Sequence, residues 1–225
     1  MKMTAPTHHV SEEQLVEYAS GACSEAAALA IACHLSLCAT CASNGRALEA
    51  VGGASLEASS AQPLDGGALD RMLARLDDEG APDVAPALDP QLEGLLEGWR
   101  VPRAVAPYLP PGVEAAHWRR LVPGVTCVDL RIGPSSTVAR LVSLSPGIEV
   151  PLHGHGGTEY TVIFTGSLVD DEGRFARGDV SIREPGDRHV QRVDAGAPCV
   201  ALVVNEGPLV PLTLKGKILG FLSRR

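Results

Sequence analysis

The sequence has few aromatic residues and lacks long apolar runs. Phe, Trp and Tyr together make up 4% of its 225 residues, so a packed core must be built mainly from Leu, Val and Ala. No apolar run reaches the roughly 18 residues that a membrane-spanning helix requires. The chain also does not open with the basic segment and apolar stretch of a signal peptide. These absences predict a cytoplasmic protein with no membrane contact.

Basic residues are scarce in the first part of the chain. Residues 1–100 carry 5 Lys or Arg and 15 Asp or Glu, whereas residues 101–225 carry 14 and 12. An acidic half repels nucleic-acid phosphate, so we expect no direct binding to nucleic acid through it. A basic protein partner would be attracted to this half, although an acidic surface also serves simply to keep a protein soluble.

The first eighty residues favour helices. Ser11 and Gln14 have the spacing of a capping box at a helix start, Ser24 can cap a second helix, and the following stretch is rich in the strong helix formers Ala and Leu. Apolar residues then recur at helical spacing near residues 69–76. We expect four helices: one from Ser11 to Ser20-Gly21, one over residues 25–37, one through residues 46–51 as far as Gly52-Gly53, and one over residues 65–77.

From about residue 101 the pattern changes to short β-branched and aliphatic runs separated by Gly and Pro, which is typical of a small β-sandwich or barrel. Before it, residues 79–90 are rich in Pro, Ala, Gly and Asp and lack a period, which suits a linker. The predicted fold is therefore α+β and multidomain, with an all-α module over residues 1–78, a linker over 79–100 and an all-β barrel over 101–225. The module is expected to fold independently of the barrel. The expected strands cover residues 126–132, 137–144, 160–164, 179–182 and 200–204.

The six cysteines are unevenly spaced, with four of them crowded between residues 23 and 41. In a chain without an export signal they should be mostly reduced, and a crowded set near a His suggests metal. His34, Cys38 and Cys41 form an H-x3-C-x2-C pattern. On one helix these side chains would share a stripe, which supplies three of the four ligands of a tetrahedral structural Zn²⁺.

The fourth ligand of this site must come from elsewhere. We expect His9, just before the first helix cap, with His8 and Cys33 as competitors. Two imidazoles and two thiolates would leave the zinc site formally neutral, which makes it easier to bury. The alternatives are small buried cysteines beside a surface His, or a redox-active C-x-x-C. Because an Ala-rich module of this size buries little apolar area, zinc would supply much of its folding free energy.

A second cluster lies in the β half, where residues 147–166 read G-x5-H-x-H-x3-E-x6-G. Residues two apart on a strand share a face, so His153 and His155 point the same way. Glu159 follows after a bend, and His189 on a later strand can join them. Three imidazoles and one carboxylate suit Zn²⁺ or another divalent transition metal such as Fe, Mn or Ni.

This second pattern resembles the cupin motifs. The resemblance implies a small β-barrel that holds a metal inside, with the three His and the Glu of the second cluster at the ligand positions. The second motif departs from the pattern at two points. Six residues instead of five separate Gly178 from Pro185, and Val193 stands where many cupins have an Asn that is not a ligand.

The N-terminal pattern resembles the zinc-binding anti-sigma signature. Together with a C-terminal cupin, including "HHVSEEQLVEYASG" and "CHLSLCATC" in order, the chain resembles the ChrR family of anti-sigma factors over nearly its whole length. The resemblance implies that residues 1–80 bind an extracytoplasmic-function-type sigma factor and block its access to RNA polymerase. It also implies that the cupin takes part in release under oxidative stress, notably singlet oxygen.

We therefore expect a regulatory binding protein and not an enzyme. The alternative is a metal-dependent cupin enzyme, a dioxygenase or hydrolase, with a helical accessory domain. A third possibility is a metal- or small-molecule-binding protein with no sigma partner. An enzyme needs an open coordination position and nearby acid or base groups, so the geometry of the second cluster discriminates among the three.

Overall fold

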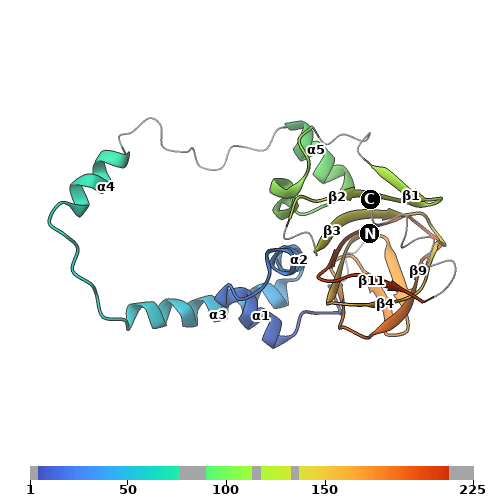
Figure 1. Ribbon diagram of the computed structural model, residues 1–225, viewed down its shortest axis with the longest axis horizontal. Coiled ribbons are helices and arrows are strands. Elements are labelled where there is room, and N and C mark those ends of the chain that lie inside the picture. Colours follow the sequence, from blue (N-terminus) through green and yellow to red (C-terminus); the bar gives the residue numbers. More distant parts are fainter. Residues whose placement is uncertain (1–4, 77–89, 113–117, 133–136, 213–225) are drawn as a thin grey trace.

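The computed structural model describes residues 5–76, 90–112, 118–132 and 137–212. Its helices come first and its strands follow (Figure 1). The helices are α1 (Glu12–Ser20), α2 (Glu25–Leu35), α3 (Ala39–Glu57), α4 (Ala68–Leu76), α5 (Pro90–Trp99) and the 3-10 helix η1 (Arg103–Tyr108). The strands are β1 (Arg119–Val122), β2 (Val125–Asp129), β3 (Val138–Leu144), β4 (Glu149–His155), β5 (Glu159–Thr165), β6 (Ser167–Asp170), β7 (Gly173–Ala176), β8 (Val180–Arg183), β9 (Arg188–Val193), β10 (Cys199–Asn205) and β11 (Leu209–Pro211).

The starts of the first two helices are confirmed. The Ser11 side chain accepts a hydrogen bond from the Gln14 backbone N–H, and the Gln14 side chain accepts one from the Ser11 N–H. The Ser24 side chain accepts from the Ala27 N–H at the start of α2. Gly21 ends α1 in the left-handed conformation, with φ of 73°, which costs Gly little because it has no Cβ.

The predicted end of the third helix at Gly52-Gly53 is wrong, because α3 continues to Glu57. Each glycine costs a helix about 1 kcal/mol relative to Ala, but neither Gly52 nor Gly53 has a positive φ. Strong helix formers on both sides outweigh this cost. The predicted fourth helix is present as α4, which begins at Ala68; Asp77, the predicted end, lies outside the described residues.

Two antiparallel sheets form the barrel. One has the strand order β1-β2-β3-β10-β5-β8 and the other β11-β4-β9-β6-β7. Each of the five predicted strand segments overlaps an observed strand, and the prediction of an all-α part followed by an all-β barrel is confirmed. Strand β4 was harder to recognise because it contains Pro151 and Gly154, two residue types that argue against a strand interior.

Part of the segment expected as a linker is helical. Residues 77–89 lie outside the described residues, but Pro90–Trp99 forms α5. Leu96 of this helix is buried, and the Trp99 ring packs edge-on against Trp118, with ring centroids 4.8 Å apart. The residues at this end of the predicted linker therefore pack as part of the folded structure.

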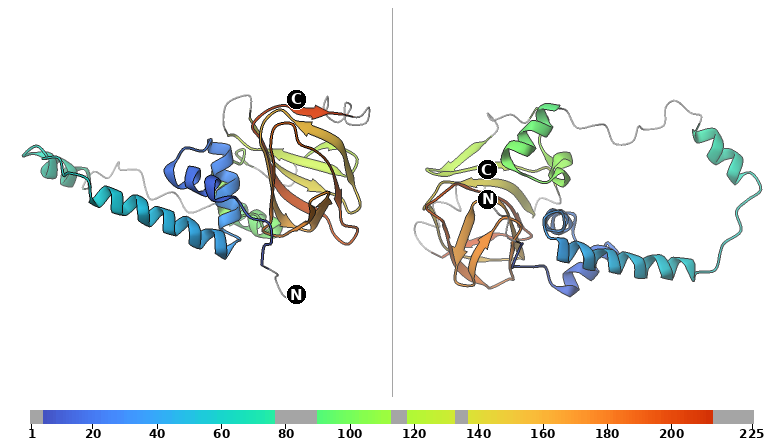
Figure 2. Two further views of the ribbon diagram at one scale, coloured as in Figure 1. Left: turned by 90° about the horizontal axis from the view of Figure 1, so that it is seen from below. Right: turned by 180° about the vertical axis from the view of Figure 1, so that it is seen from behind.

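The helical part shares one hydrophobic core with the outer face of the barrel. Helix α2 packs against β5 and β10, and its buried residues, such as Ala30 and Ile31, belong to the same cluster as Leu141, Val162 and Leu202. The many alanines of α2 let its backbone approach the sheet closely. The expectation of a helical core that is independent of the barrel is therefore wrong, and Figure 2 shows α2 beside the barrel from two further directions.

Two candidate metal centres

The first cluster lies where the N-terminal segment meets the turn between α2 and α3. His9 precedes α1, His34 is in the last turn of α2, Cys38 is the N-cap of α3 and Cys41 is in its first turn. One ligand atom from each residue lies within 4.8 Å of the others. The Nδ1 atom of His9 is 3.3 Å from Cys38 Sγ and 3.4 Å from Cys41 Sγ. The structure thus brings all four predicted residues together.

The spacing of His34, Cys38 and Cys41 predicted that all three lie on one helix, and this prediction is wrong. Helix α2 ends at Leu35, and Ser36 donates its hydroxyl hydrogen to the Cys33 carbonyl over 2.7 Å. The last carbonyl groups of a helix lack backbone N–H partners, and a side-chain hydroxyl that donates to one of them helps the helix to end there. The chain then turns, and α3 begins after Cys38. The cluster therefore draws His34 from the end of α2 and the two cysteines from the start of α3.

His34 has a free lone pair aimed at this cluster. Its Nδ1 lies 2.7 Å from the Gly178 carbonyl oxygen, so Nδ1 carries the proton and donates. Its Nε2 is buried and has no hydrogen-bond partner. Burial lowers the pKa of His34, although the bond to Gly178 opposes this change. A neutral imidazole with one nitrogen anchored and the other unpartnered is the usual form of a metal ligand.

The two thiols complete a donor set that fits zinc. Burial, together with the neighbouring Cys38, raises the pKa of the Cys41 thiol to about 11. A bound divalent cation reverses this effect, because a coordinating thiol is deprotonated. Two sulfurs and two imidazole nitrogens match a closed tetrahedral zinc site. His9 is the exposed member of the set, and the other three side chains are buried.

Neither competitor for the fourth position reaches this cluster. The His8 ring packs on Phe175, with ring centroids 4.1 Å apart, and its Nδ1 lies 3.6 Å from an Asp179 carboxylate oxygen. Cys33 is fully buried in the shared core, where burial raises the pKa of its thiol to about 12. The geometry therefore favours His9.

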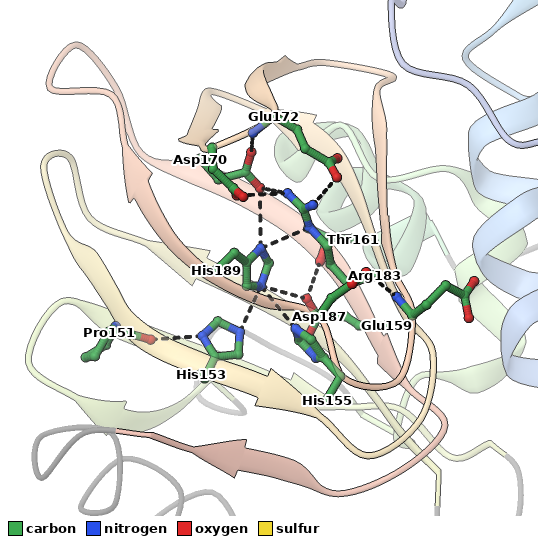
Figure 3. A network of polar contacts seen from close by, with 12 residues as sticks. Pro151, His153, His155, Glu159, Thr161, Asp170, Glu172, Arg183, Asp187 and His189 are labelled. Atoms are coloured by element: carbon green, nitrogen blue, oxygen red, sulfur yellow. Dashed lines mark hydrogen bonds and ion pairs between the residues drawn. The ribbon is translucent and has the colours of Figure 1, made fainter.

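The second cluster joins both sheets inside the barrel (Figure 3). His153 and His155 lie on β4, His189 lies opposite His153 on β9, and Glu159 begins β5 of the other sheet. The His189 Nε2 atom is 3.0 Å from His153 Nε2 and 3.2 Å from His155 Nε2. A Glu159 oxygen is 3.7 Å from His189 Nε2. All four side chains are buried.

The ring nitrogens of this cluster that face one another can offer lone pairs to a metal. The Nδ1 of His153 lies 2.9 Å from the Pro151 carbonyl oxygen, so it donates and leaves a lone pair on Nε2. Burial lowers the pKa of both His153 and His155 to about 4, which keeps these rings neutral near pH 7. Metal ligation requires neutral imidazoles, and a cation at the centre would bind lone pairs that otherwise repel. The four predicted residues fit a metal site.

Two charged residues behind His189 escaped the sequence prediction. Its Nδ1 lies 3.3 Å from an Asp170 oxygen and 3.2 Å from Arg183 Nε. Arg183 is also paired with Asp170 over 2.5 Å. Burial alone would raise the pKa of Asp170, but hydrogen bonds from His189 and Arg183 outweigh it and hold the pKa at about 2. The acidic run at residues 170–172 was the available signal, and it looks like an ordinary solvated turn.

A small cavity adjoins the barrel cluster. Its volume is about 160 Å³, and His153 and Glu159 form part of its wall. The remaining wall is largely apolar and comes from both sheets. This volume is below the roughly 300–1,000 Å³ of ordinary ligand pockets, so the cavity admits only a small molecule.

Comparisons with known proteins agree with both halves of this architecture. Residues 112–210 match the family model described as the ChrR Cupin-like domain. The chain is 36% identical over 203 residues to the Anti-sigma-E factor ChrR of Cereibacter sphaeroides, covering 90% of this chain and 91% of that protein. It is also similar to the solved structure of Rhodobacter sphaeroides SigE in complex with the anti-sigma ChrR, with a TM-score of 0.73 and 33% identity. That match covers 89% of this chain and 99% of the other.

The described helices include none that could span a membrane. Within residues 5–76, 90–112 and the strand-rich remainder of the described chain, no helix is both long and apolar enough.

Proposed function

The chain belongs to the ChrR family of anti-sigma factors, and from this premise we propose that it is a cytoplasmic, zinc-dependent anti-sigma factor. It sequesters an extracytoplasmic-function-type sigma factor and releases it under oxidative stress, with singlet oxygen as the first stress to test. The observation that carries this proposal is the similarity to ChrR in complex with SigE over both the helices and the barrel, covering 89% of this chain.

Zinc in the first cluster would hold the helical part together. The four ligands span the N-terminal segment, α2 and α3, and few other side chains of these elements are buried away from the barrel. Leu15 is the buried residue of α1, and Cys41 and Gly45 are those of α3. Zinc supplies a four-way cross-link when bound, and the residues of this chain set its geometry.

Helix α4 offers a surface for a protein partner. Leu69, Met72, Leu73 and Leu76 recur at i, i+3, i+4 and i+7 and are 65%, 64%, 49% and 73% exposed. This spacing makes one continuous apolar stripe, and α4 stands apart from the barrel in Figures 1 and 2. An amphipathic helix of this kind docks into an apolar groove of another protein. We assign the stripe to the sigma factor.

The barrel cluster has a separate task in this proposal. Its ligands come from β4, β5 and β9, so a bound metal would fasten the two sheets to each other. None of these ligands is needed to build the helical surface. We therefore assign the helical part to inhibition and the barrel cluster to the response that ends it.

The proposal is tested by purifying the tagged chain from its own cells and identifying a co-purifying sigma factor by mass spectrometry. That sigma factor is then added to core RNA polymerase and a target promoter. We expect transcription to fall when the zinc-loaded chain is added, and to recover when a chelator removes the zinc. Unchanged transcription at saturating zinc-loaded chain would overturn the proposal, and turnover of a small molecule at the barrel cluster would favour the enzyme alternative.

A further inference from the structure

One barrel turn touches the helical metal cluster from two sides. Asp179 lies between β7 and β8, and it is 3% exposed. One of its carboxylate oxygens accepts the backbone N–H of Thr7 over 2.6 Å and that of His8 over 3.0 Å. The other oxygen accepts the Ala176 N–H over 2.7 Å within the barrel. The carboxylate thus joins the barrel to the two residues that directly precede His9.

Gly178, the neighbouring residue, provides the second contact. Its carbonyl oxygen accepts the hydrogen bond from His34 Nδ1. The residue has φ of +89°, and an added Cβ would lie 2.7 Å from Pro6 Cγ and 3.3 Å from Leu37 Cβ. A side chain does not fit there, so only glycine lets the barrel backbone come this close to both the N-terminal segment and the α2–α3 turn.

We propose that Gly178 and Asp179 are positioning residues of the N-terminal metal site and make its metal affinity depend on the barrel. We call the pair the barrel clasp. This inference rests on the proposed zinc site and adds a means by which the barrel controls it. Gly178 selects the tautomer of His34 that presents Nε2 to the metal, and Asp179 fixes the chain at Thr7 and His8 so that His9 is held beside the two thiols.

Two physical effects explain how the barrel clasp would raise the metal affinity of the N-terminal site. A hydrogen bond to the second nitrogen of a ligating imidazole fixes the ring orientation and raises its basicity. His9 is exposed and sits on a segment with no regular secondary structure, so ordering it would cost conformational entropy each time the metal binds. Because Asp179 already holds the two preceding residues, that cost is met before the metal arrives.

Strand β8 connects the clasp with the barrel cluster. This four-residue strand begins directly after Asp179 and ends at Arg183. The Arg183 guanidinium contacts His189 and Asp170. A change at His189 that displaces β8 would therefore reach His34 and His9 through the backbone of a single short strand. This gives the regulatory division proposed above a physical route.

The test uses the full chain loaded with Co²⁺ in place of zinc. Thiolate ligands give cobalt a charge-transfer absorption band that the sulfur-free barrel cluster does not give, so this band reports the N-terminal site alone. A competing chelator is titrated in while the band is followed. For Asp179→Ala we expect a loss of affinity of roughly 10- to 100-fold, the usual effect of removing a group that orients a metal ligand.

Three further variants separate positioning from simple damage to the barrel. Asp179→Asn keeps one carbonyl oxygen for Thr7 and His8, so it should lie closer to wild type than Asp179→Ala. Thr7→Pro removes one N–H donor without altering the barrel and should weaken the site. The matched control is Asp194→Ala, which removes a barrel carboxylate whose partners are Ser167 and Arg174 and should leave the titration unchanged. Circular dichroism checks that each barrel remains folded.

The outcomes distinguish the clasp from the zinc site. If the wild-type chain shows no thiolate–cobalt band, the proposed N-terminal metal site itself is wrong. If the band is present and both Asp179→Ala and Thr7→Pro release cobalt at the wild-type chelator concentration, the site stands and the clasp is overturned. Weakening in both variants, with partial recovery in Asp179→Asn and none in the control, supports the clasp.

Discussion

The two candidate metal centres are built in opposite ways. Three ligands of the helical centre lie within eight residues of one another, two of them are thiols, and His9 is exposed. The barrel centre gathers its ligands from three strands in two sheets, contains no sulfur and is buried throughout. Thiolates are both zinc-selective and oxidisable, so only the helical centre offers sulfur ligands to an oxidant.

The supporting residues differ as well. The barrel centre has its own supporting residues, since Pro151 contacts His153, and Asp170 and Arg183 contact His189, all from within the barrel. The helical centre takes its support from Gly178 and Asp179 of the barrel. The difference teaches that the barrel centre is supported from within the barrel, whereas the helical centre depends on both halves of the chain.

The largest expected effect comes from breaking the helical centre. Cys38→Ser should remove one equivalent of zinc, unfold the helical part and abolish inhibition of the sigma factor. Structural zinc contributes about 10–16 kcal/mol in small zinc-dependent folds, and α1 and α3 bury few side chains that could replace it. Metal analysis and circular dichroism measure both effects. Cys23→Ser, at a half-buried cysteine outside the cluster, is the control, and unchanged helicity in metal-free Cys38→Ser would show that zinc is not structural.

Breaking the barrel centre should have a narrower effect. Glu159→Ala removes the carboxylate of that cluster, so the barrel should lose its metal and unfold at a lower temperature while zinc stays on the thiolates. Element-specific metal analysis with thermal unfolding checks this. The control is Glu184→Ala, an exposed carboxylate near the same edge that accepts a hydrogen bond from Thr158. Loss of both metals in Glu159→Ala would contradict the separation of the two centres.

A milder change sharpens the comparison of the supporting residues. Asp170→Asn weakens the acceptor behind His189, and we expect the barrel metal to bind roughly 10- to 100-fold more weakly. The thiolate–cobalt band should persist with a smaller loss of affinity, because Asp170 reaches the helical ligands only through Arg183 and β8. Chelator competition monitored separately at the two sites gives both values. Equal weakening at both centres would mean that the barrel support is not local.

The smallest effect is expected on α4. Leu73→Glu places a charge on the apolar stripe and should weaken sigma binding by about 1–2 kcal/mol, as for a residue within an interface. The free energy of unfolding should change by less than about 0.5 kcal/mol, because the side chain is exposed. Calorimetric titration with the sigma factor and denaturant unfolding test the two halves of this statement. Arg75→Glu, in the last turn of the same helix, is a control for charge, and equal weakening there would argue against a specific role for the stripe.

Much of both sites was predictable because ligand spacing is a local property. His34, Cys38 and Cys41 are close in the sequence, and three of the barrel ligands lie within the seven residues from His153 to Glu159. The capping residues of α1 and α2 were readable for the same reason. Gly52 and Gly53 misled because the neighbouring helix formers outweigh a weak local preference.

The supporting contacts could not be predicted, because they join segments that are far apart in the sequence. His34 and Gly178 are 144 positions apart, and Thr7 and Asp179 are 172 apart. No local pattern marks a carbonyl oxygen or a buried carboxylate as the partner of a distant imidazole or N–H group. The contact between α2 and the barrel escaped for a related reason, since an Ala-rich helix indicates helicity but not the surface that it covers.

The division of labour between the two centres is tested most directly by sigma-dependent transcription before and after exposure to singlet oxygen. Wild type, Cys38→Ser and Glu159→Ala are compared, with the metal content of each confirmed beforehand. We predict that wild type inhibits and then releases, that Cys38→Ser never inhibits, and that Glu159→Ala inhibits equally before and after exposure. A normal oxidant response in Glu159→Ala that lacks the barrel metal would contradict the account.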